Sequence, residues 1–179
     1  RIDPQSGTAI FGEYSPALDW FTPGPDIALR PGESGTLWFS LTVPQNVPPE
    51  SFYLGLFAAE KNVRAGARVG TLLFLHTEGE TRESLTLQSL SALVDDAVTA
   101  EARIDNTGEI HVVPRGQLTL EHPLTGFVRT QPINSDKHMI LPGEYGMFSW
   151  QFDALPWYTY GRVRLQATIL YGFTNQTIA

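Results

Sequence analysis

The chain has 179 residues, a length that suits one ordinary domain or two small ones. Hydrophobic residues make up 42% and charged residues 17%, a composition too apolar for a disordered chain. The net charge is −7 and no basic cluster is present, so nucleic acid and anionic membranes are not expected partners.

Two further classes of feature are missing from the sequence. Cysteine is absent, which excludes disulfides and thiolate metal sites. No apolar run approaches the roughly 20 residues that cross a bilayer, so we expect no membrane-spanning segment in this chain. No charged-then-apolar leader precedes the first residues, and this is compatible with a signal peptide or anchor removed by processing.

Apolar alternation predicts a series of short strands in the first half. Residues 1–26 are a mixed lead-in with one strand at most. Apolar side chains then alternate from Ile27 and again from Leu37 to Val43, and a period of two is typical of strands. Further strands are expected over 52–59, 70–77 and 84–90. The apolar run from Leu72 to Leu75 indicates burial on both faces.

The second half has the same pattern. Alternation predicts strands over 98–104, 110–113, 117–120, 148–152 and 163–169, and Asn106-Thr107-Gly108 predicts a turn. One stretch is ambiguous: residues 90–97 also fit a helical face. We favour a strand or extended linker there over a short helical turn.

A repeated turn motif suggests two similar domains. Pro31-Gly32-Glu33 recurs as Pro142-Gly143-Glu144, 111 positions later, and each copy precedes an alternating aromatic segment. That spacing matches one immunoglobulin-like domain plus a linker. The predicted fold is therefore all-β, with two tandem immunoglobulin-like β-sandwich domains over 1–91 and 92–179. Because Pro-Gly-Glu is a common turn, a chance repeat is the alternative.

Several segments resemble a known family. Residues 27–33, 37–44 and 46–56 resemble the first domain of bacterial WxL-interacting-type cell-surface proteins, and 104–108 with 114–116 look like the opening of their second domain. The resemblance covers most of residues 27–170. It implies an exported protein whose first domain associates with cell-wall peptidoglycan and whose second binds another protein or a host ligand. No binding residue is transferred from it.

Catalytic and metal-binding patterns are not found in the sequence. Gly32-Glu33-Ser34-Gly35 fails as a nucleophile elbow because its second glycine is one residue early. The four histidines, at positions 76, 111, 122 and 138, lack the close spacing of a zinc site. We therefore expect no enzyme, no cofactor and no metal. A catalytic site assembled from distant residues, and a calcium site at the domain junction from Asp95, Asp96 and Asp105, are the alternatives.

Aromatic residues are the candidate partner-contact sites: Trp38, Trp157, Tyr158 and Tyr160. Such side chains offer a large contact area at low entropy cost. A core plug at one end of a sandwich is the more ordinary role for them.

These observations lead to one functional hypothesis and two alternatives. The hypothesis is a non-catalytic extracellular binding or adhesion module on the bacterial cell surface, which docks on cell-wall polysaccharide, peptidoglycan or a protein. The first alternative is a structural subunit that self-associates into a surface filament or layer. A pilus-type periplasmic chaperone is the second, and the scatter of Arg103, Arg115 and Arg129 disfavours it because such a chaperone needs a basic cleft.

Overall fold

The computed structural model describes residues 3–6, 8–10, 12, 14–61, 68–95, 97–153, 162–172 and 175–178. The chain divides into two compact units. The larger unit comprises Arg1–Ile10 and Thr81–Ala179, and the smaller unit comprises Phe11–Glu80. Each unit is described by itself below.

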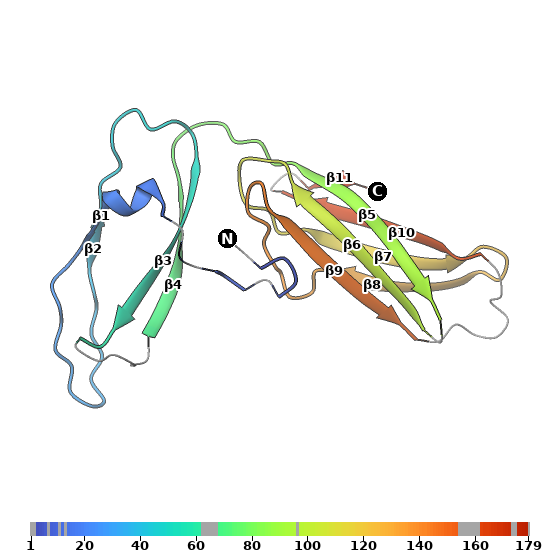
Figure 1. Cartoon of the computed structure of the whole chain (residues 1–179), viewed down its shortest axis with the longest axis horizontal. Helices are drawn as coiled ribbons and strands as arrows, with labels where there is room; N and C mark the ends of the chain where they lie inside the picture. The colour runs from blue at the N-terminus through green and yellow to red at the C-terminus, as the bar shows by residue number, and fades with distance from the viewer. Residues whose placement is uncertain are drawn as a thin grey trace. The chain divides into compact units, whose positions relative to one another are not determined.

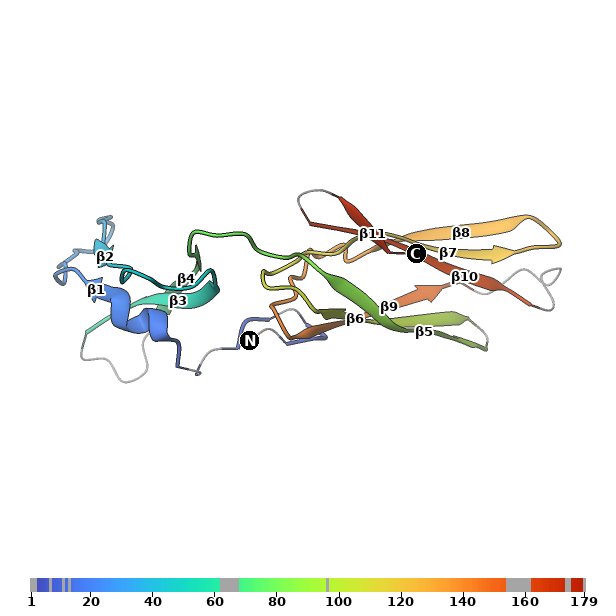
Figure 2. The same cartoon turned by 90° about the horizontal axis from the view of Figure 1, so that it is seen from above.

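The described residues of the larger unit form seven strands (Figure 1). One antiparallel sheet has the order β5-β6-β9, and the other has the order β11-β10-β7-β8. The two sheets face each other as the layers of a β-sandwich (Figure 2). The strands are β5 (Leu85–Val94), β6 (Val98–Asn106), β7 (Arg115–His122), β8 (Phe127–Ile133), β9 (Tyr145–Phe152), β10 (Arg164–Tyr171) and β11 (Gln176–Ile178).

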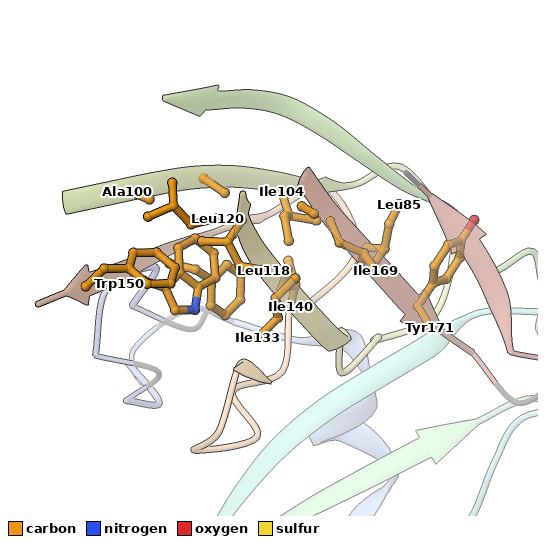
Figure 3. Close-up of a cluster of buried hydrophobic side chains, with 14 of the residues drawn as sticks. Leu85, Ala100, Ile104, Leu118, Leu120, Ile133, Ile140, Trp150, Ile169 and Tyr171 are labelled. Carbon is orange, nitrogen blue, oxygen red and sulfur yellow. The ribbon is translucent and has the colours of Figure 1, made fainter. Parts of the chain in front are cut away.

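Alternation places the core between these layers. In β6 every second residue from Val98 to Asn106 is buried, and β9 buries every second residue up to Phe152. Side chains of successive strand residues point to opposite faces, so this pattern gives one apolar face per sheet. Leu118 and Leu120 from β7 and Ile169 from β10 meet that face from the opposite sheet (Figure 3).

The smaller unit contains less regular structure and a smaller core. A short 3₁₀ helix, η1 (Pro16–Trp20), begins with a proline, whose missing amide donor is not needed at a helix start. Two two-stranded sheets follow, and among the described residues the core consists of the buried Ala17, Phe52 and Leu54 with partly buried neighbours. The strands are β1 (Phe21–Pro23), β2 (Phe39–Leu41), β3 (Ser51–Ala59) and β4 (Arg68–His76).

The unit boundary differs from the predicted one. The predicted domains meet between residues 91 and 92, but this position lies inside β5, which pairs with β6 from Leu85 to its end at Val94. The alternation before Leu90 therefore opens the larger unit instead of closing the first one. Since β5 continues to Val94, residues 90–94 are strand and not a helical turn.

Several strands are shorter or longer than predicted. Residues 52–59, 70–77, 98–104, 117–120, 148–152 and 163–169 overlap β3, β4, β6, β7, β9 and β10. By contrast, only Phe39–Leu41 of the stretch 37–43 is strand, and of the predicted strand 110–113 only Val112 pairs, in an isolated bridge to Ile140. Strand β8 was not predicted.

The expected burial of the run from Leu72 to Leu75 holds on one face of β4 only. Leu73 and Leu75 pack against the core of the smaller unit. Leu72 and Phe74 point the other way and are 39% and 42% exposed.

The repeated Pro-Gly-Glu motif is a turn in both places. Gly32 and Gly143 have φ values of 84° and 73°, and the following glutamate amide donates to the residue before proline in each copy. Proline followed by a glycine at positive φ is the signature of a type II turn. The copies differ afterwards, because Gly143 leads directly into β9 whereas β2 begins only at Phe39.

Candidate functional site

Strand β9 has one open edge in the larger unit. It pairs with β6 on one side, and no described strand pairs with its other side. The amide of Asn106 donates to the carbonyl of Glu144 over 2.9 Å. The backbone groups of Glu144, and of every second residue after it, therefore point toward β6. Because backbone groups in a strand alternate in direction, those of Met147, Ser149 and Gln151 face outward.

A turn near the start of the chain covers one end of this edge. The carbonyl of Pro4 accepts a hydrogen bond from the Met147 amide over 2.7 Å. The turn is held by Asp3, whose carboxylate accepts from the amides of Gln5 and Ser6 at 3.1 and 2.7 Å. An aspartate that bonds the amides that follow it is the usual Asx turn. Residues 3–6 are called the lead turn below.

Side chains from the opposite sheet cover the other end. The Gln131 side-chain amide on β8 donates to the carbonyl of Gln151 over 2.7 Å. The indole N–H of Trp150 donates to the carbonyl of Pro132 over 3.0 Å. Pro132 is tolerated inside β8 because β8 is an edge strand. Both bonds link the two sheets across this side of the sandwich.

The loop after β8 is fixed by one asparagine. The side-chain amide of Asn134 donates to the carbonyls of Pro114 and His138 at 2.9 and 2.8 Å, and its side-chain oxygen accepts from the His138 amide at 2.7 Å. Its φ of 57° is left-handed, a conformation that asparagine tolerates better than most residues. The loop is therefore held in a defined shape.

These parts enclose a pocket of about 280 Å³ next to Ser149, which we call the β9 pocket. Its polar wall consists of Gln5, Gln131, Asn134, Ser135, Asp136 and His138. Phe148 and Trp150 also line it, but they are only 8% and 7% exposed. The pocket therefore offers amides, hydroxyls and one carboxylate over a mostly buried aromatic floor.

The predicted partner-contact aromatics have different outcomes. Trp38 is 75% exposed in the smaller unit, so it does not act as a core plug. Trp157, Tyr158 and Tyr160 lie outside the described residues, and their predicted role stays a prediction.

Trp38 belongs to a set of exposed apolar side chains that we call the apolar arm. The arm is a long antiparallel excursion: it extends the pairing of β1 with β2 by a hydrogen bond from the Gly24 amide to the Trp38 carbonyl, 2.8 Å long, and it reverses direction at Gly32. Its apolar members are between 41% and 75% exposed: Ile27, Leu29, Leu37, Trp38, Phe39 and Val43.

Asp95 and Asp105, the two described carboxylates of the calcium hypothesis, do not come together. Asp95 lies in the turn that joins β5 to β6, whereas Asp105 pairs with Thr86 near the opposite end of this hairpin. The Asp105 carboxylate accepts a 2.8 Å bond from Arg103, and Asp96 lies outside the described residues. Within the part of the chain that the structure describes, no group of three His, Cys, Asp or Glu side chains is placed to hold a metal ion. In the same residues, no helix is long and apolar enough to cross a membrane.

Sequence reasoning missed the β9 pocket. The alternation of Phe148, Trp150 and Phe152 was noted, but its complement, Ser149 and Gln151, was not considered as an open edge. Which strand lies at an edge depends on the strand order, and local alternation does not reveal it. The pocket is also lined by Gln5, which lies about 140 positions before Ser149 in the sequence.

Comparisons with known proteins leave the family open. No family model, curated protein or solved structure matches this chain.

Proposed function

We propose that this protein is a non-catalytic extracellular binding module of the bacterial cell surface, which docks on cell-wall polymer or on a protein attached to it. The resemblance of residues 27–56 to WxL-interacting-type surface proteins supports this proposal. The apolar arm, which lies in the same stretch, is the observation that carries it.

The arm exposes several large apolar side chains that lie close together in the sequence. Trp38 is 75% exposed, and Leu29 and Leu37 are 52% and 50% exposed nearby in sequence. Contiguous exposed apolar surface marks interaction sites in soluble proteins, and burying it contributes about 25 cal/mol per Å². Tryptophan is also enriched among residues that dominate binding energy. The arm therefore suits a docking role.

The strand order of the larger unit supports an immunoglobulin-like assignment for that unit. If β5 to β11 are lettered A to G, the sheets read A-B-E and D-C-F-G. The constant-type immunoglobulin domain has A-B-E-D and C-F-G, so the two arrangements differ by transfer of one edge strand. A second such domain in residues Phe11–Glu80 stays a prediction, because the described strands there form two two-stranded sheets.

Sedimentation with bacterial cell walls tests the proposal. The chain is mixed with purified peptidoglycan and, separately, with walls that keep their attached proteins. Trp38→Ala should lower the affinity about tenfold or more, as for other aromatic contact residues. Leu124→Ala is the matched control, since Leu124 is 91% exposed in the larger unit. Binding only to protein-bearing walls identifies a protein partner, and binding to neither overturns the proposal.

The structural-subunit alternative has one observation in its favour. Sheets of two strands are marginal alone, and β1–β2 and β3–β4 have only two strands each among the described residues. Strand addition from a second copy would extend them. A molecular mass that rises with concentration in sedimentation equilibrium, and falls again when Trp38 is replaced, would favour assembly over monomeric binding.

A further inference from the structure

We propose that the open part of the β9 edge binds an extended peptide segment of a partner protein, which pairs with Ser149 and places a basic side chain in the β9 pocket. The inference rests on the proposed function of a binding module and names the chemistry of one partner. It concerns the larger unit, whereas the apolar arm belongs to the smaller one.

The backbone of Ser149 is available for strand pairing. Its amide and carbonyl face away from β6, as the bond of Met147 to Pro4 shows for the position two residues earlier. No described residue hydrogen-bonds to either group. An amide donor and a carbonyl acceptor on one edge residue match those of an extended peptide, which is the basis of β-strand addition.

The edge already accepts a backbone carbonyl at the next outward-facing position, Met147. The carbonyl of Pro4 in the lead turn accepts a hydrogen bond from the outward-facing Met147 amide. Gln131 bonds the Gln151 carbonyl at the other end, so the open length centres on Ser149. A segment of about three residues fits between these contacts at ~3.3 Å per residue. A longer peptide, such as one of five residues, would extend past these contacts at its ends or displace the lead turn, whose hydrogen bond to β9 contributes only about 1 kcal/mol.

A peptide fits this site better than a sugar. Sugars gain much of their affinity by stacking on exposed aromatic faces, because a ring offers a large flat contact. Phe148 and Trp150 are 8% and 7% exposed, and the Trp150 N–H is already bonded to Pro132. The accessible parts of the pocket are instead amides, hydroxyls and ladder groups, which pair with peptide bonds.

The pocket wall selects a basic side chain. Asp136 lines the pocket, and no described residue forms an ion pair with it. The neighbouring Lys137 does not line the pocket. His138 is the other titratable group of the wall. A lysine or arginine that enters the pocket would therefore meet the Asp136 carboxylate, neutral amides and the His138 imidazole.

An NMR titration of the ¹⁵N-labelled full chain tests the proposal. The probe is the pentapeptide VTKTV, acetylated and amidated at its ends, at millimolar concentration. The amide signals of Ser149 and its neighbours should shift, and that of Leu124 should not. Replacing the central lysine of the probe by glutamate, or Asp136→Asn in the chain, should weaken binding about threefold, as expected for an exposed ion pair.

Matched variants separate the backbone contact from the side chain. Ser149→Pro removes the outward amide while leaving the ladder to β6 intact, because that amide does not face β6. It should abolish the shifts, whereas Ser149→Ala should keep the affinity within about twofold since its backbone is unchanged. If Ser149→Pro fails to fold, the same test is made on the peptide by N-methylation of the two threonines that flank its lysine. One of them pairs with Ser149 when the lysine side chain lies on the pocket side of the strand, and its methylation removes the donor to the Ser149 carbonyl.

Three results would overturn the proposal: no shift with VTKTV, shifts that survive both Ser149→Pro and N-methylation, or shifts produced by the trimer of N-acetylglucosamine but not by the peptide. Its failure is distinguishable from failure of the proposed function. Wall binding that depends on Trp38 without peptide binding at Ser149 overturns only the β9 inference. Peptide binding without any wall binding overturns only the docking role of the apolar arm.

Discussion

The side-chain amide of Asn106 donates to the carbonyl of Ile140 over 2.8 Å inside the larger unit. The same nitrogen donates to the carbonyl of Ile110 at 2.8 Å, and the side-chain oxygen accepts from the Gly108 amide at 2.9 Å. Asn106 is 1% exposed. A buried polar group this fully bonded holds the end of β6 against the loop that leads into β9.

Asn106→Ala should therefore destabilise the larger unit by about 2 kcal/mol, because it leaves buried backbone groups short of partners. Asn106→Asp keeps the acceptor for Gly108 but turns a carboxylate toward two carbonyls, so we expect at least as large a loss at neutral pH. Urea unfolding followed by tryptophan fluorescence measures both. A wild-type midpoint for Asn106→Asp would show that the two donated bonds do not matter.

Sequence patterns predicted where the strands lie better than they predicted which segments pack or pair with one another. The alternation of β6, β9 and β10 identified those strands because each has one buried face. Strand β8 was not predicted, because its buried residues do not alternate regularly and because it contains Pro132. The turn at Asn106 was predicted from its composition, but the burial of its side chain depends on Ile140, 34 positions away. Long-range pairing of this kind leaves no local signal, which is also why the β9 pocket was missed.

Gly116 has no room for a side chain. Its φ is 143°, a conformation almost restricted to glycine, and an added Cβ would overlap the Thr168 carbonyl of the paired strand β10. Gly116→Ala should cost about 3 kcal/mol, from overpacking and backbone strain together.

Gly126→Ala is the control for Gly116→Ala, since Gly126 also has a positive φ, 69°, but has no heavy atom within 4 Å of an added Cβ. It should cost about 1 kcal/mol. Thermal unfolding of the two variants gives the comparison, and equal losses would mean that the contact with Thr168 plays no part.

Trp150 is buried and Trp38 is exposed, so replacing each by phenylalanine should change the stability by very different amounts. Trp150→Phe removes the bond to Pro132 that links the sheets and leaves space in the core, which should cost about 2 kcal/mol. Trp38→Phe should change stability by less than about 0.5 kcal/mol because Trp38 is 75% exposed. Urea midpoints test this directly. A large loss with Trp38→Phe would assign Trp38 a packing role.

The two cores should respond to mutation independently, because they lie in separate units. Leu118→Ala in the larger unit should cost about 3 kcal/mol. Leu54→Ala in the smaller unit should cost a similar amount. Because the described core of that unit has only three buried residues, this variant should unfold the smaller unit before the larger one. Hydrogen exchange read per residue distinguishes the two. Loss of protection across both units in either variant would contradict the division of the chain.

The stability of the larger unit should fall as the pH drops below about 6.5, the ordinary pKa of histidine. Burial lowers the pKa of His111, and the carboxylate of Glu83 opposes this shift in part. Between the lowered pKa and 6.5 the unfolded state binds more protons than the folded state, so the free energy of unfolding rises with pH across that window. His111→Asn should flatten this dependence in urea unfolding measured from neutral to acidic pH. Glu83→Gln should steepen it, because the pKa of His111 then falls further; an NMR titration of the His111 ring that showed a pKa above 6.5 in the wild-type chain would reverse the expected sign.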